Sequence, residues 1–163
     1  MARTDLFIGL IKPIGVTKTD FVRELEIEAA QYNYNLAEIR LSQLLHDVYP
    51  ERQLETHAGV NRYEEHMRAG TDVCTKMTDA SAVASLGILQ IKSARPKPTT
   101  PEAAKPTIYL INSLKRRPEV RLLRRIYRDA FIAVALHSTR EERGDHLEGE
   151  FVSIPGTKAF HRS

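Results

Sequence analysis

The most informative stretch of the chain is residues 6–20, which read LFIGLIKPIGVTKTD. The first six residues are apolar throughout, which is typical of a strand buried on both faces of a parallel sheet. The residues that follow include Pro13 and Gly15 and predict a tight loop. Apolar residues at helical spacing over residues 19–32 then predict a helix. The stretch therefore has the layout of a strand, a loop and a helix start.

A loop in this position can bind phosphate. In a P-loop the backbone amides cradle the phosphates, a Lys neutralises them and a Ser or Thr hydroxyl holds Mg²⁺. The pattern G-x-x-x-x-G-K-[ST] aligns with residues 12–19, but its two glycine positions hold Lys and Thr here. We therefore predict a phosphate-binding loop that departs from the pattern at both glycines. Its predicted residues are Lys12, Gly15, Thr17, Lys18 and Thr19.

Composition limits the class of protein. A chain of 163 residues with 42% hydrophobic residues can form one domain with its own core. Its single cysteine, Cys74, provides neither a disulfide framework nor a cysteine-based metal centre, so we expect no metal site and no zinc site in this chain. The first apolar run is too short for a signal peptide or a membrane span. We expect a cytoplasmic protein without a membrane partner, and homo-oligomerisation stays open.

The order of predicted elements gives the fold class. Strands are predicted at residues 6–11, 36–41, 107–111 and 130–136, with helical segments between them. This pattern predicts an α/β three-layer sandwich with a mostly parallel sheet flanked by helices. Two helix starts are also predicted, one capped by Asp79 and one opened by a capping box from Ser138 to Glu141.

The domain boundaries follow from composition. Residues 1–147 are predicted to form one domain. Residues 95–106 contain four of the eight prolines and are predicted to be an exposed connector inside it. Residues 148–163 are predicted to be a C-terminal tail or a linker toward a missing domain.

Several segments carry a resemblance to a known family. Residues 6–19 match the opening of P-loop nucleotide kinases of the dephospho-CoA kinase and adenylate kinase type. More specific matches are GLIKPIG at 9–15, IRLSQLL at 39–45, RYEEHMRAG at 62–70 and YLINSLKRRPEVRLLRRIY at 109–127, which leads into FIAVALHSTREER at 131–143. In their order and spacing these segments resemble the N-terminal P-loop kinase-like domain of anti-phage deoxycytidylate (dCTP/dCMP) deaminases.

The resemblance implies a two-part antiviral defence enzyme, in which a zinc-dependent deaminase domain follows the P-loop domain and hydrolytically removes the amino group of deoxycytidine nucleotides. That chemistry needs H-x-E and P-C-x-x-C, and one cysteine cannot supply the second motif. The chain is therefore interpreted as a degenerate nucleotide-binding, regulatory domain of such a deaminase, as a fragment or a stand-alone relative. We expect it not to be catalytic by itself, and no catalytic residue is assigned. Its expected partners are an NTP or dNTP with Mg²⁺ and a deaminase domain or subunit.

Two alternatives stay open. An active (deoxy)nucleotide kinase would use the same loop, but Asn112 stands where a kinase places an acid near Mg²⁺, and Asp47 or Glu38 would have to replace it. On the acceptor-nucleotide side we name Arg62 and Arg68. The other alternative is a module that binds RNA or protein through the basic segment 115–128, which has a net charge of +6. Its arginines form either a phosphate lid or a basic surface; they are Arg116, Arg117, Arg121, Arg124, Arg125 and Arg128.

Overall fold

The computed structural model describes residues 4–52, 54, 60–95 and 105–152. Within these ranges the chain forms an α/β fold with one four-stranded sheet, in which every pair of neighbouring strands is parallel. The strand order is β2-β3-β1-β4, so β1 is a central strand. The strands are β1 (Leu6–Ile11), β2 (Asn35–Arg40), β3 (Thr107–Leu114) and β4 (Phe131–Ala135).

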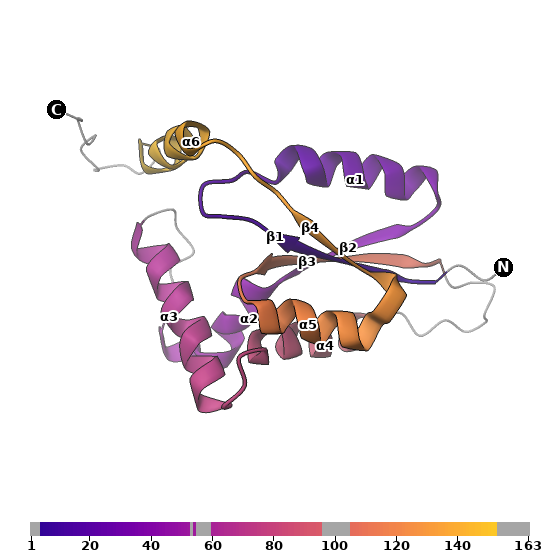
Figure 1. The fold of residues 1–163 in the computed structure, drawn as a ribbon, viewed down its shortest axis with the longest axis horizontal. Helices are drawn as coiled ribbons and strands as arrows, with labels where there is room; N and C mark the ends of the chain where they lie inside the picture. Colours follow the sequence, from indigo (N-terminus) through magenta and orange to yellow (C-terminus); the bar gives the residue numbers. More distant parts are fainter. Residues whose placement is uncertain (1–3, 53, 55–59, 96–104, 153–163) are drawn as a thin grey trace.

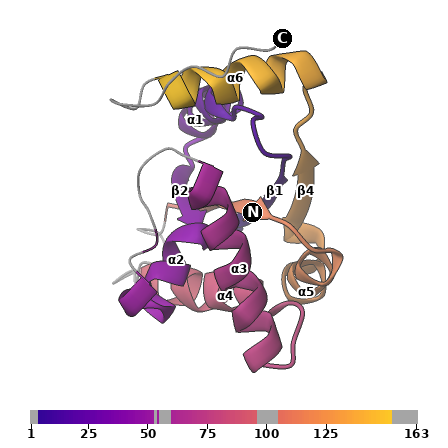
Figure 2. The same ribbon diagram turned by 90° about the vertical axis from the view of Figure 1, so that its left-hand side faces the viewer.

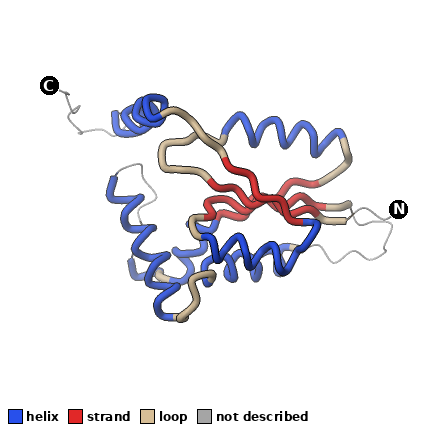
Figure 3. The backbone as a smooth tube through the Cα atoms, viewed as in Figure 1, coloured by secondary structure: helices blue, strands red, loops and turns tan. Residues whose placement is uncertain are grey.

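Helices cover both faces of the sheet (Figure 1). Figure 2 shows α1 and α6 on one side and α2, α3, α4 and α5 on the other, and Figure 3 shows the strands between the two helical layers. The helices are α1 (Thr19–Gln31), α2 (Leu41–Val48), α3 (Val60–Lys76), α4 (Ala82–Ala94), α5 (Arg117–Tyr127) and α6 (Arg140–Val152). The expected flanked, parallel sheet is therefore confirmed.

The central strands are buried on both faces, which explains their unbroken apolar sequence. Successive side chains of a strand point to opposite faces. In β1, Phe7 belongs to the larger core beneath α2, α4 and α5, whereas Ile8 and Leu10 belong to the smaller core beneath α1. In β3, Tyr109 and Leu110 divide in the same way. The two cores thus pack against opposite faces of the sheet and bury the paired strands β1 and β3 between them.

Some expected boundaries differ from the structure. The strand predicted at 36–41 ends at Arg40, because Leu41 already begins α2. Residues 62–95 form two helices, and the position before α4 is Ser81, whose backbone N and Oγ both donate to Asp79 Oδ1. Asp79 therefore orders the turn ahead of the helix, although it is not its N-cap.

The predicted capping box before α6 is also shifted by one residue. Thr139 Oγ1 accepts from the backbone of Glu142 at 3.2 Å, and the Glu142 carboxylate accepts from the backbone of Thr139 at 2.8 Å. The pair Thr139 and Glu142 satisfies the same spacing as Ser138 and Glu141, so sequence spacing alone cannot separate the two registers.

Two predicted segments lie largely outside the described ranges: residues 96–104 of the connector and residues 153–163 of the tail. Helix α6 continues past the predicted boundary at residue 148, to Val152. No helix within the described ranges is both long and apolar enough to cross a membrane.

Candidate functional site

The predicted loop lies at a branching point of the sheet. Strand β1 connects through α1 on one face, and its neighbour β3 connects through α5 on the other face (Figures 1 and 2). The two connections leave the same edge of the sheet in opposite directions, outside the carboxyl ends of the strands. This is the position at which open α/β sheets bind their ligands.

The loop between β1 and α1 has a defined shape. Gly15 has φ +82°, a left-handed conformation that glycine adopts without the strain a side chain would bring. The backbone N of Val16 donates to the carbonyl of Pro13 at 3.3 Å. Lys12 Nζ donates to the carbonyl of Val16 at 2.7 Å and ties the loop across its base. Lys12 thus stands at a glycine position of the P-loop pattern and closes the loop with its own side chain.

Helix α6 lies directly over this loop. A Cβ built on Gly15 would stand 2.8 Å from the backbone oxygen of Arg143 and 3.2 Å from Leu147 Cδ1. These distances are shorter than ordinary van der Waals contacts. The backbones of the loop and α6 therefore approach each other closely at Gly15, and no larger residue fits there without displacing α6.

The loop ends at the N-terminus of α1. Lys18 occupies the N-cap position and makes no side-chain capping hydrogen bond. Thr17 supplies part of the cap instead, because its Oγ1 accepts from the backbone N of Thr19 at 3.3 Å and lies 3.1 Å from Thr19 Oγ1. The first amides of a helix and its dipole favour an anion at this end.

A charged cluster fixes the Lys18 side chain. Lys18 Nζ forms an ion pair with Glu38 Oε1, and Asn112 Nδ2 donates to the same oxygen at 2.9 Å. Arg40 Nε donates to Glu38 Oε2 at 3.1 Å. Burial alone would raise the pKa of Glu38, but the hydrogen bonds and charges of Lys18 and then Arg40 outweigh it, so the pKa of this carboxyl is lowered. Glu38 therefore stays ionised beside the loop at neutral pH.

Lys115, directly after β3, brings a further cation to the β1–α1 loop. Its Nζ donates to the carbonyl of Lys12 at 3.1 Å. Although the side chain as a whole is exposed, desolvation of its ammonium group lowers the pKa of Lys115, while the charge of Glu119 acts in the opposite direction. Glu119 is 3% exposed and accepts from the backbone N atoms of Lys115 and Arg116 at 2.7 and 2.9 Å. This buried carboxylate fixes the turn that presents Lys115.

The arginines of α5 are arranged along the helix rather than around the loop. Arg116 lies at the start of α5 and donates to Thr71 Oγ1 of α3 at 2.9 Å. From there α5 runs along the sheet toward the beginning of β4 (Figure 1). The remaining arginines are all exposed; they are Arg117, Arg121, Arg124, Arg125 and Arg128. The structure thus presents a basic surface on α5, whose distal arginines lie away from the β1–α1 loop.

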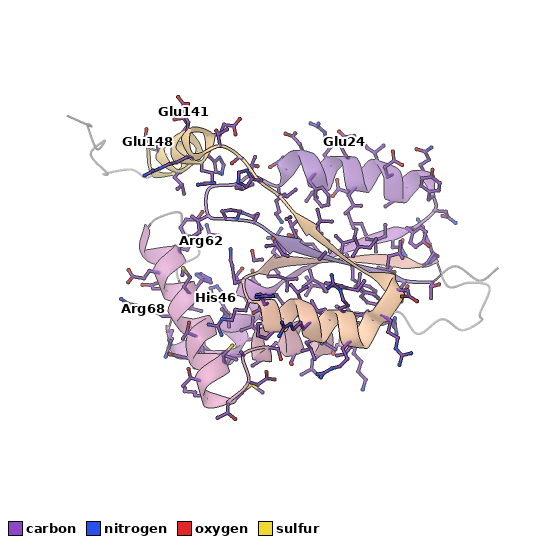
Figure 4. The ribbon with its side chains drawn as sticks, viewed as in Figure 1. Glu24, His46, Arg62, Arg68, Glu141 and Glu148 are labelled. Atoms are coloured by element: carbon purple, nitrogen blue, oxygen red, sulfur yellow. The ribbon has the colours of Figure 1, made fainter. Side chains whose placement is uncertain are left out.

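The two residues predicted on the acceptor side have different surroundings. Arg62 is in the first turn of α3, the end of that helix nearest the β1–α1 loop, and it is half-buried (Figure 4). Arg68 faces outward, 71% exposed, and pairs with Glu64 one turn earlier. Of the two, only Arg62 therefore lies at the end of α3 nearest the β1–α1 loop.

Sequence reasoning found the loop but missed part of its surroundings. Glu38 was considered only as a substitute acid, and Lys115 only as part of a basic segment. The parallel register β2-β3-β1 places both beside the loop, because Arg40 pairs with Asn112 and Asn112 pairs with Leu10. The available signal was one acidic residue inside the predicted strand 36–41 and a polar stretch directly after the predicted strand 107–111. A comparison with models of known protein families found no match, and a search of curated proteins found none either.

Proposed function

We propose that the chain is a degenerate P-loop domain that binds the phosphates of a nucleotide and regulates a deoxycytidine nucleotide deaminase. One observation carries the phosphate site: a loop with a left-handed Gly15 leaves the central strand and ends at a helix N-terminus, with Lys18 at the cap. Lys12 and Lys115 add positive charge beside the loop, since their Nζ atoms donate to the carbonyls of Val16 and Lys12. A helix N-terminus with lysines beside it, at the carboxyl edge of a parallel sheet, suits a phosphate group.

The ion pair between Lys18 and Glu38 supports regulation more than turnover. In a working phosphate loop the lysine reaches the β- and γ-phosphates. Here Glu38 and Asn112 hold a network that Lys18 must leave before it contacts a ligand. A nucleotide therefore competes with Glu38 for Lys18 and rearranges β2 and β3 side chains as it binds. The P-loop kinase-like fold and the link to a deaminase rest on the sequence resemblance.

The position of Glu38 also favours a second candidate, an active nucleotide kinase. Asn112 has no charge to offer Mg²⁺, but Glu38 places a carboxylate oxygen 2.9 Å from the Asn112 amide. Once Lys18 turns to the phosphates, this carboxylate is free to hold a water of the Mg²⁺ shell. In this candidate the neighbouring strand supplies the acid that β3 lacks.

Thermal unfolding with each NTP and dNTP, with and without Mg²⁺, tests the phosphate site. A ligand at 100 times its Kd adds about 2.7 kcal/mol and raises Tm by about 5–10 °C in a chain of this size. Lys18→Ala should weaken binding at least tenfold. Lys92→Ala, on the exposed face of α4, is the matched control and should bind as the wild type does. If no nucleotide shifts Tm, the proposed function is wrong.

Two measurements separate the candidates once binding is found. Sustained phosphate transfer to deoxynucleoside monophosphates supports the kinase and contradicts a purely regulatory domain. Glu38→Gln should tighten binding of metal-free nucleotide, since Lys18 is released. If Glu38 holds Mg²⁺, the same variant should weaken binding of the Mg²⁺–nucleotide complex. A regulatory domain of a deoxycytidine nucleotide deaminase should also prefer dCTP or dCMP to the other nucleotides.

A further inference from the structure

A second cluster lies apart from the loop, between α2 and α3. His46 of α2 and His66 of α3 are both half-buried, and their Nε2 atoms are 3.3 Å apart. Their ring centroids are 5.2 Å apart. Figure 4 shows His46 between the sheet and α3. The two residues are 20 positions apart in the sequence and meet only because the two helices pack together.

The tautomer of His66 is set by its backbone contact. His66 Nδ1 is 2.7 Å from the carbonyl oxygen of Arg62, one turn earlier in α3. A carbonyl only accepts, so Nδ1 carries the proton and donates it. In the neutral ring Nε2 then has a free lone pair directed at His46. Histidines that bind metals commonly donate their other ring N–H to a backbone carbonyl, which orients the ligand nitrogen.

The distances between the two rings match a shared metal ion. Imidazole nitrogens lie about 2.0–2.1 Å from Zn²⁺, so two of them at a tetrahedral angle are about 3.3 Å apart, with ring centroids about 5.2 Å apart. A straight N–H···N hydrogen bond at the same nitrogen separation would place the centroids about 5.6 Å apart. The observed 3.3 and 5.2 Å fit a shared metal ion, and they equally fit a bent hydrogen bond from His46 Nε2 to His66 Nε2, so metal titration decides between the two.

We propose that His46 and His66 form a two-histidine site for a divalent transition metal ion, which would join α2 to α3. Imidazole suits Zn²⁺, Ni²⁺ and Cu²⁺, and Cu²⁺ binds most tightly of the three. No group of three or more His, Cys, Asp and Glu side chains suited to a metal occurs among the described residues, so the proposal names the two histidines alone as ligands. No side chain of the proposed nucleotide site takes part in this site, and its one link to the acceptor side is the backbone carbonyl of Arg62.

The test is metal binding to the full chain. Tm is measured with CuCl₂, NiCl₂ and ZnCl₂ and again after EDTA is added. At ten times Kd the metal should raise Tm by about 3–6 °C, and EDTA should reverse the rise. His46→Gln and His66→Gln should each abolish it. His137→Gln, which changes a histidine outside the pair, should retain it. No metal-dependent rise in the wild type, or the same rise in both pair variants, would overturn the proposal.

A spectroscopic measurement keeps the proposal testable if a variant folds poorly. Electron paramagnetic resonance of the wild type with one equivalent of Cu²⁺ should show coupling to two imidazole nitrogens. Coupling to none or to one contradicts the site. Lys18→Ala should lose nucleotide binding and keep metal binding, whereas His66→Gln should lose metal binding and keep nucleotide binding. The two proposals can therefore be judged independently.

Discussion

Replacing Glu38 by Gln removes one negative charge from the network around Lys18 and keeps the side-chain shape. The Glu38 carboxylate interacts with Lys18 and Asn112 through one oxygen and with Arg40 through the other. The Lys18 and Glu38 side chains are 25% and 21% exposed. The burial of this ion pair is therefore intermediate. Exposed pairs contribute about 0.2–1 kcal/mol to stability, and disruption of buried pairs costs about 3–5 kcal/mol. We expect Glu38→Gln to destabilise the protein by about 1–2 kcal/mol at pH 7.

The stability difference between wild type and Glu38→Gln should decrease as the pH is lowered. The pKa of Glu38 is lowered from 4.5 in the folded state, so its contribution is complete above that value. It is lost as the pH falls through the lower folded-state pKa, because the carboxyl then becomes protonated and resembles the Gln amide. The stability difference between wild type and Glu38→Gln should therefore shrink below about pH 4.5.

Urea unfolding followed by circular dichroism, at pH 7 and at a series of acidic pH values, measures this difference. Glu24→Gln is the matched control, since Glu24 lies on the exposed side of α1 with a side chain 63% exposed (Figure 4). The control should change stability by less than about 0.5 kcal/mol. A Glu38→Gln stability difference that stays constant from pH 7 into the acid range would contradict this explanation, because a difference that comes from the charge must shrink as Glu38 is protonated.

Four further substitutions, at three positions, test the packing around the site by the same urea unfolding. Gly9→Ala should destabilise the protein by about 1–3 kcal/mol, since the new Cβ would lie 2.6 Å from Leu114 Cδ1 and 2.8 Å from Phe131 Cζ. An unchanged midpoint of urea unfolding would show that both side chains move aside freely. Glu119→Ala should lower the free energy of unfolding by about 1–3 kcal/mol, because it leaves two backbone N–H groups without their acceptor. Glu119→Gln should lower it less, and an equal loss in the two variants would contradict this expectation. Tyr109→Phe should be neutral or stabilising by up to about 1 kcal/mol, because the buried Tyr109 hydroxyl has no hydrogen-bond partner in the described structure. A clear loss of stability would show that this hydroxyl does form a hydrogen bond.

Much of the fold could be read from local patterns. The apolar runs of β1 and β3 predict strands buried on both faces, and each was found with a core on either side. The helix after the loop begins at Thr19, as its sequence predicts. Errors arose where two registers satisfy the same pattern, as for Ser138 and Thr139 before α6. Such choices depend on how the next element packs, which spacing does not contain.

The candidate site likewise combines features that are local in the sequence with contacts between distant segments. The strand, the loop with Gly15 and the helix start with Lys18 were predictable, because these residues are contiguous and depend on local backbone preferences. The contacts of Glu38 with Lys18, of Lys115 with Lys12 and of α6 with Gly15 were not predictable in this way. The first two contacts arise from the strand order β2-β3-β1-β4, because parallel pairing brings residues 20 and 103 positions apart to one edge of the sheet. That order follows from how two faces of the sheet are buried, which no single segment specifies.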